Sequence, residues 1–344
     1  MKLGVLSVDP NDGTSYYRSW GPLSQLPEIQ LKELTIQSSW KDVMQVDGVF
    51  MQRPFGADAV QFAHKVKKQC KFLWCDWDDN VFEVPQLNPG ADYFKAHAPS
   101  VIDLSLMADA VSLSTNTLTE VFSAAIKRRD HIHLIPNAVD YTWYDKLKPL
   151  PRPDTQYKMS ILWRGSASQS DEIRYFAPQI EYLILKHPEV LWIFQGYKPY
   201  FLLQNLPENA FRYIPWSDIP ECFVRQYQVQ PDIMAITLSD TRFNRCRSHG
   251  AWLEGTMAGA VCVAPAWEEW DHKSIMNYET PNQFVDRIEA LISMSAEQRK
   301  ELHTCAINEI KSEYTWDVTN KQRMRVLEQL GQTPSQVAVQ LLPR

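Results

Sequence analysis

The sequence has no long uncharged apolar run, and no segment approaches the length that a membrane-spanning helix requires. It also has no paired cysteines. The six cysteines are scattered without a CxxC pair, which argues against a zinc site and against a disulfide framework. An excess of positive charge is absent too. A formal net charge of −6 argues against a protein that coats nucleic acid through bulk electrostatics, although that sum would not reveal a local basic groove.

The composition is that of an ordinary globular chain. Its 344 residues, 44% of them hydrophobic and 22% charged, are enough for two domains with separate cores. The N-terminal MKLGVLSVDP carries one lysine and a short apolar run without a small-residue cleavage site, so we expect a first strand and not a signal peptide. We therefore expect a cytoplasmic protein without a membrane span, either a monomer or a dimer.

Apolar strands alternate with polar loops and amphipathic helices along the chain. Strands are expected near residues 2–8, 29–34, 48–51, 72–75, 108–114 and 131–136, and again near 159–163, 190–194, 211–214, 232–237 and 261–264. Between the two series, residues 144–157 are rich in proline and polar residues, which is typical of a linker. The pattern predicts an α/β fold of two Rossmann-like, doubly wound domains, residues 1–148 and residues 149–312.

Residues 243–265, FNRCRSHGAWLEGTMAGAVCVAP, combine a basic cluster, a helix, a turn and a strand. Arg245, Arg247 and Ser248 precede apolar positions at helical spacing. We expect them at a helix N-terminus, where free N–H groups and the helix dipole favour a phosphate or diphosphate. Glu254 follows about two turns later, where its carboxylate can accept hydrogen bonds from ribose hydroxyls. The alternative is a solvated basic helix start with an exposed glutamate.

Loops at the carboxyl ends of the strands form the expected ligand edge of each domain. In the first domain this edge carries Asp12, Gly13, Tyr17 and Arg18 after the first strand, and Asp76, Asp78 and Asp79 in DWDDN after the fourth. In the second domain it carries Arg164, Gly165, Ser166, Gln195 and Gly196. The three aspartates allow three interpretations: a DxD that holds a metal on a diphosphate, a group that orients the acceptor or acts as a base, and caps of the following loop and helix.

The order of these motifs resembles a GT-B glycosyltransferase, specifically the retaining family 4 type and its divergent relatives in phages. HLIPNAVD and ADAVSLSTNTLTEVF are similar to the end of the family's first domain, and ILWRGSASQSDEI resembles the start of its second. FNRCRSHGAWLEGTMAGAVCVAP resembles the donor segment. YTWDVTN resembles the terminal segment, which implies that a helix at residues 313–330 crosses back to the first domain and that residues 331–344 form a tail.

The resemblance implies roles for several residues. Glu254 matches the second glutamate of the family's paired-glutamate motif, which holds the donor ribose. The first glutamate of that pair falls at Cys246, so the sequence departs from the family at the position that normally contacts the donor sugar. Arg164 resembles the arginine near the donor diphosphate. Arg245, Arg247 or Lys198 could replace the family's lysine at the phosphates. The full set of candidate donor-binding residues is Gly165, Ser166, Gln195, Gly196, Asn244, Arg245, Arg247, Ser248 and Glu254.

The implied reaction moves a sugar from a nucleoside diphosphate sugar, with UDP favoured, to an acceptor hydroxyl. Arginines and a helix N-terminus would stabilise the departing diphosphate without a metal or a tightly bound cofactor. Arg164 is then a candidate catalytic residue, together with Asp78 and Asp79, which would face the acceptor in the interdomain cleft. The candidate acceptor-binding residues are Asp12, Gly13, Tyr17, Arg18 and Asp76.

The sequence leaves the acceptor and two other functions open. The phage relatives suggest a hydroxymethylated base in phage DNA, modified in the host cytoplasm, and a glycan or a small molecule are the other candidates. The same architecture also serves nucleotide-sugar epimerases. A nucleotide-sugar-binding protein that has lost catalysis is the third possibility, because Cys246 replaces a family glutamate.

Overall fold

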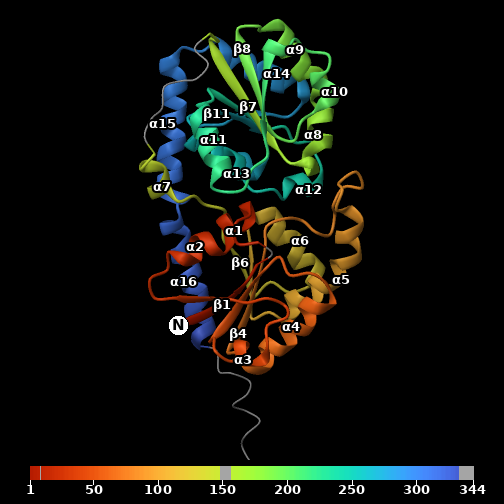
Figure 1. The fold of residues 1–344 in the computed structure, drawn as a ribbon, viewed down its shortest axis with the longest axis vertical. Coiled ribbons are helices and arrows are strands. Elements are labelled where there is room, and N and C mark those ends of the chain that lie inside the picture. Colours follow the sequence, from red (N-terminus) through yellow and green to blue (C-terminus); the bar gives the residue numbers. More distant parts are fainter. Residues whose placement is uncertain (8, 148–155, 333–344) are drawn as a thin grey trace, which may run out of the picture.

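The computed structural model describes residues 1–7, 9–147 and 156–332. These residues form two lobes stacked along the long axis, and the chain completes most of the first lobe before it enters the second (Figure 1). Among the described residues, no helix is long and apolar enough to cross a membrane.

The N-terminal half is built on a six-stranded parallel sheet with strand order β2-β1-β3-β4-β5-β6. Its strands are β1 (Lys2–Leu6), β2 (Gln30–Glu33), β3 (Gly48–Gln52), β4 (Phe72–Trp77), β5 (Ala110–Leu113) and β6 (Ile132–Leu134). Every residue of β3 and β4 is buried, as expected where helices cover both faces of a parallel sheet. The strand order reverses between β1 and β3, so the loops after these two strands open at the carboxyl edge of the sheet.

The C-terminal half repeats this plan with strand order β12-β11-β10-β7-β8-β9. Its strands are β7 (Met159–Gly165), β8 (Val190–Gly196), β9 (Phe211–Pro215), β10 (Ile233–Ala235), β11 (Val261–Pro265) and β12 (Met276–Tyr278). The order reverses between β7 and β10, and the loop after β7 lies at that point. The sequence did not predict β12.

Helices flank both sheets (Figure 1). In the N-terminal half they are α1 (Gly13–Arg18), α2 (Trp20–Ser24), α3 (Trp40–Val43), α4 (Gly56–Gln69), α5 (Ala91–Met107) and α6 (Asn116–Ile126). The next helix, α7 (Tyr141–Asp145), lies beside the C-terminal half, where Tyr144 is buried in one cluster with Leu162 and Phe223 (Figure 1). In the C-terminal half they are α8 (Ser170–Tyr175), α9 (Ala177–Lys186), α10 (Tyr200–Leu203), α11 (Glu221–Val229), α12 (Arg242–Arg245), α13 (Gly250–Met257), α14 (Pro281–Ser293) and α15 (Ala296–Glu313).

The last helix, α16 (Trp316–Gln332), leaves the C-terminal half and packs on the N-terminal half (Figure 1). Val326, Leu327 and Leu330 lie in one buried cluster with Leu3 and Val5 of β1. The side-chain amide of Asn320 also donates to the carbonyl oxygen of Pro22 at 2.8 Å. The predicted fold class is therefore confirmed: two doubly wound α/β units face each other, and a terminal helix crosses back to the first.

The structure differs from the expected pattern within residues 243–265. The helix expected directly after the basic cluster is present, because α13 begins at Gly250. The difference is an additional short helix, α12, which ends at Arg245 inside the cluster. The turn after α13 contains Gly259 at φ 105°, a backbone conformation that favours glycine. The predicted domain boundary at 148/149, most of the linker and residues 333–344 of the tail lie outside the described residues.

Candidate active site

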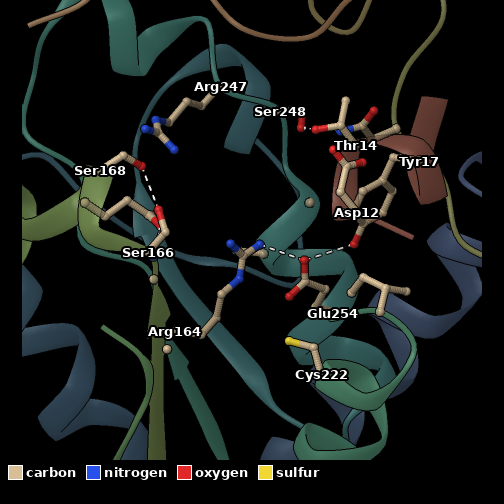
Figure 2. Close-up of a pocket in the computed structure, with 18 of the residues that line it drawn as sticks. Asp12, Thr14, Tyr17, Arg164, Ser166, Ser168, Cys222, Arg247, Ser248 and Glu254 are labelled. Atoms are coloured by element: carbon tan, nitrogen blue, oxygen red, sulfur yellow. Dashed lines mark hydrogen bonds and ion pairs between the residues drawn. The ribbon is translucent and has the colours of Figure 1, made fainter. Parts of the chain in front are cut away.

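A cavity of about 420 Å³ lies between the two halves and is lined by residues of both. The N-terminal half contributes the ends of β1, β3 and β4, and the C-terminal half contributes the ends of β7, β8 and β9 with the start of α13. Polar side chains from both halves point toward one another across this space (Figure 2). The cavity therefore joins the two carboxyl edges at which parallel α/β sheets bind ligands.

Glu254 of α13 is the centre of a buried hydrogen-bond network in this cavity (Figure 2). Its Oε1 accepts from Nη2 of Arg164 at 2.7 Å and from the hydroxyl of Tyr17 at 3.0 Å. Its Oε2 accepts from the side-chain amide of Gln226 at 3.1 Å. Tyr17 belongs to α1 of the N-terminal half, so this carboxylate connects the two halves directly.

Charge and burial fix the protonation states in this network. Burial disfavours the cation of Arg164, but the surrounding groups, of which the carboxylate of Glu254 has the largest effect, together outweigh burial, and the pKa of Arg164 is raised. Burial, and next the negative charge of Glu254, raise the pKa of the Tyr17 hydroxyl well above its usual value. Arg164 therefore stays cationic, and Tyr17 stays a protonated donor, at every physiological pH.

The start of α13 forms an anion-binding wall next to this network. Its N-cap residue, His249, makes no side-chain hydrogen bond to the first turn, so no side chain caps the first N–H groups of the helix. A Cβ atom placed on Gly250 would lie 4.0 Å from Nη2 of Arg164, so the guanidinium is close to this helix end. Arg247 and Ser248 precede the helix and also line the cavity.

Arg247 and two serines extend the same wall. Figure 2 shows Arg247, Ser166 and Ser168 beside the space above Arg164. Nε of Arg247 donates to Oδ1 of Asn244 at 3.1 Å, and the hydroxyls of Ser166 and Ser168 are 2.7 Å apart. Two guanidiniums, two hydroxyls and a helix N-terminus thus face one region of the cavity, an arrangement suited to a diphosphate.

The opposite wall belongs to the N-terminal half and carries an ion cluster. Arg53, at the end of β3, pairs with Asp79 at 2.6 Å and with Asp78 through its Nε. Burial raises the pKa of Asp78, although the nearby guanidinium of Arg53 opposes that effect. Asp12 and Gly13 also line this wall. The wall that carries Asp12, Gly13, Asp78 and Asp79 therefore faces the candidate donor residues across the cavity.

Two of the predicted acceptor residues lie elsewhere. Arg18 and Asp76 form a buried ion pair of 2.7 Å, with side chains 0% and 2% exposed, behind the cavity wall. Asp76 also accepts from Ser112, and Arg18 also donates to Ile135 and Asn137. Neither residue lines the cavity. Their partners on neighbouring elements draw both side chains into the core, so the structure corrects their predicted location.

Two of the predicted donor residues also lie outside the lining. Arg245 pairs with Asp240 at 2.6 Å on the surface, because α12 ends at this residue and turns its side chain away. Asn244 is fully buried and donates to Oε1 of Glu172 at 2.7 Å. Since Asn244 also accepts from Arg247, its contact with the cavity is indirect. Gly165, Ser166, Gln195, Gly196, Arg247, Ser248 and Glu254 do line the cavity.

Cys246 points away from the cavity and into the N-terminal half. Its side chain is fully buried in the same apolar cluster as Val81 and Phe122. Its carbonyl oxygen accepts from the hydroxyl of Thr115 at 3.1 Å. The position that the sequence resemblance aligns with a glutamate is therefore a packing contact between the halves in this chain.

The three aspartates at the end of β4 do not present a shared metal site. Asp76 is held by Arg18, whereas Asp78 and Asp79 are held by Arg53. Within the described ranges, no group of three or more histidine, cysteine, aspartate or glutamate side chains could hold a metal ion. The interpretation of DWDDN as a metal-binding DxD therefore lacks support.

Several lining residues were not selected from the sequence as donor or acceptor residues. Arg53 follows β3, and Trp216, Ser217 and Asp218 follow β9. Trp216 is 63% exposed at the edge of the cavity. The rule that strand ends carry ligand residues, applied to every strand, would have found all four.

Comparison with known proteins gives structural matches only. No protein-family model matches the sequence, and no curated protein matches it. Anabaena HepE, solved in complex with UDP and glucose, superimposes with a TM-score of 0.66 at 14% identity over 96% of this chain and 100% of that chain. An E. coli trehalose-6-phosphate structure bound with UDP-2-fluoro glucose superimposes with a TM-score of 0.65 at 12% identity over 97% and 100%.

A UDP-forming α,α-trehalose-phosphate synthase from Burkholderia xenovorans also matches, with a TM-score of 0.60 at 12% identity over 86% of this chain and 77% of that chain. At these identities the similarity establishes the arrangement of the chain and nothing finer. The protein has the GT-B fold, with two six-stranded parallel sheets that face a shared cavity.

Proposed function

We propose that the protein is a glycosyltransferase that uses a UDP-sugar as donor. The observation that carries this proposal is the convergence of Arg164 and Arg247 on the uncapped N-terminus of α13, inside the cavity between the two halves. Such an arrangement neutralises a diphosphate. The similar structures from Anabaena and E. coli were solved with UDP and with a UDP-sugar analogue, which supports UDP as the nucleotide.

In the proposed reaction, an acceptor hydroxyl oxygen forms a bond to the anomeric carbon, and the bond from that carbon to the diphosphate oxygen breaks. The departing UDP keeps the electron pair of the broken bond, and the proton of the acceptor hydroxyl passes to the departing phosphate oxygen. Arg164 and Arg247 stabilise the charge that develops on that oxygen, which makes a metal unnecessary. Asp78 and Asp79 orient the acceptor hydroxyl from the opposite wall. Retention of the anomeric configuration, implied by the sequence resemblance, is part of this proposal.

The experiment has two steps on the full chain. Calorimetric titration with UDP tests the nucleotide site, and a panel of UDP-sugars with and without EDTA tests the turnover through release of UDP. We expect saturable UDP binding and consumption of at least one UDP-sugar at the same rate in EDTA. Failure to bind UDP and to consume any UDP-sugar would refute the proposal. Nuclear magnetic resonance of the glycosylated product then reports whether the anomeric configuration is retained.

A further inference from the structure

The N-terminal wall of the cavity carries a cluster that the proposed donor chemistry does not use. Arg53 bridges Asp78 and Asp79, and we call these three residues the acceptor triad. Their side chains are 27%, 11% and 36% exposed, so each presents polar atoms to the cavity. β3 and β4 are adjacent and in register, with Gln52 opposite Asp76, which brings the ends of the two strands together.

The charge on this wall is unbalanced. Asp12, Asp78 and Asp79 face the cavity with three carboxylates, whereas Arg53 supplies the one guanidinium of the N-terminal lining. The C-terminal wall differs, because Arg164 and Arg247 match the two carboxylates of Asp218 and Glu254 there. An anion is therefore disfavoured near the acceptor triad, whereas the balanced C-terminal wall, with the N-terminus of α13, accommodates one.

The cavity itself has features of a site built for a polar ligand. Gln195 and Trp270 line it and are 2% and 1% exposed. The side-chain oxygen of Gln195 and the indole nitrogen of Trp270 have no hydrogen-bond partner in the structure. Such atoms also occur elsewhere among the described residues, but these two line the C-terminal wall of the cavity, where a polar ligand could supply the missing partners.

The chemistry of the acceptor triad suits hydroxyl groups. Carboxylates accept hydrogen bonds from hydroxyls, and the guanidinium donates to hydroxyl oxygens, so a carboxylate and a guanidinium side by side can bind two adjacent hydroxyls at once. A phosphate group lacks hydroxyl donors of this kind at neutral pH and would be repelled by the excess of carboxylates.

We propose that the acceptor triad is the acceptor subsite and that the acceptor is an uncharged saccharide or polyol with adjacent hydroxyls. This inference rests on the proposed function, since it assigns the second substrate of the same cavity. It also separates the acceptors that the sequence left open, because a modified base in DNA carries phosphodiester anions on both sides of the reacting hydroxyl.

The test compares acceptors at equal concentration with the UDP-sugar that the full chain hydrolyses fastest. The arms are neutral mono- and disaccharides and polyols, glucose 6-phosphate, and duplex DNA that contains 5-hydroxymethylcytosine. We expect neutral saccharides or polyols to increase UDP release above the rate of donor hydrolysis in a saturable manner. A kcat/KM for DNA or for glucose 6-phosphate that exceeds the value for every neutral acceptor would overturn the inference. The inference would also fail if the protein hydrolyses the donor and no neutral saccharide or polyol increases the rate of UDP release.

A variant pair links the result to the triad. Asp79→Asn removes one charged acceptor, and we expect the KM for the neutral acceptor to rise about ten- to a hundredfold while the Kd for UDP stays the same. Asp240→Asn is the matched control, because Asp240 also pairs with an arginine, at 2.6 Å, but lies outside the cavity lining. An unchanged acceptor KM in Asp79→Asn would refute the subsite. If the wild type itself does not bind UDP, the proposed function is refuted instead.

Discussion

Replacement of Tyr17 by phenylalanine tests the connection between the two halves at the candidate donor site. The variant removes the hydroxyl that donates to Oε1 of Glu254 at 3.0 Å. Both residues are buried, since Tyr17 is 8% exposed and Glu254 is 6% exposed. A buried hydrogen bond to a charged group contributes about 1.5–3 kcal/mol. We therefore expect the free energy of unfolding in urea to fall by about that amount in the absence of nucleotide.

The effect on UDP binding has the opposite sign. Arg164, Tyr17 and Gln226 already occupy three of the four lone-pair directions of the Glu254 carboxylate. If a ribose hydroxyl of UDP takes the place of Tyr17 on this carboxylate, the wild type must break the hydrogen bond from Tyr17 to Glu254 when UDP binds. The Tyr17→Phe variant has no such bond to break. We expect the Kd of UDP, measured by calorimetric titration, to be about tenfold lower in the variant, since tenfold corresponds to about 1.4 kcal/mol.

Tyr16→Phe is the matched control. Its hydroxyl accepts from the backbone N–H of Asp140 at 3.2 Å, and its ring packs edge-on against Tyr17 at 5.0 Å, but Tyr16 does not line the cavity. The control should leave the Kd of UDP unchanged. Weaker UDP binding in Tyr17→Phe would mean that Tyr17 contacts the nucleotide directly and would refute the exchange of partners on Glu254.

Three further substitutions test other parts of the site. Arg247→Ala should raise the Kd of UDP about ten- to a hundredfold in calorimetric titration, because a charged hydrogen-bond donor is lost, whereas Arg245→Ala, which removes a surface arginine outside the cavity, should leave the Kd unchanged. Cys246→Glu should lower the free energy of unfolding in urea by several kcal/mol, because it would bury an unpaired carboxylate in an apolar cluster. A variant as stable as the wild type would contradict the packing role of Cys246. Arg18→Met should cost about 3–5 kcal/mol of stability, because it strands the buried carboxylate of Asp76; a loss of less than about 1 kcal/mol would contradict this account of the pair.

The sequence predicted most of the architecture and the side of each sheet on which the cavity opens. Alternating strands, loops and helices identified eleven of the strands, and the strand-end rule brought Asp78, Asp79 and Arg164 into one cavity with Glu254. These inferences succeed because hydrophobic periodicity is local and because all strands of a doubly wound sheet point their carboxyl ends to one edge.

The failures arise where a long-range partner decides which way a side chain points. Arg18 and Asp76 were placed at the correct edge, but they bind each other across 58 positions of sequence and lie in the core. Arg245 and Arg247 are two residues apart, and the end of α12 between them turns the first to Asp240 on the surface and leaves the second at the cavity. No periodic signal in the sequence marks that helix end.

The segment 243–265 has a second role that follows from its contacts. Several polar contacts between the halves involve this segment and its neighbours: they join Tyr17 to Glu254, Asn137 to Ser248, Thr115 to the carbonyl of Cys246, Asn116 to Glu268, and Glu83 to Arg242. All of these partners in the C-terminal half lie within residues 242–268, the stretch that also carries the start of α13 and Arg247. A nucleotide that binds there competes for some of the same atoms, so nucleotide binding and the placement of the two halves must influence each other by equal free energies. Cys246 fits this arrangement, because a glutamate at that position would have to leave the contact with the N-terminal half to remain solvated.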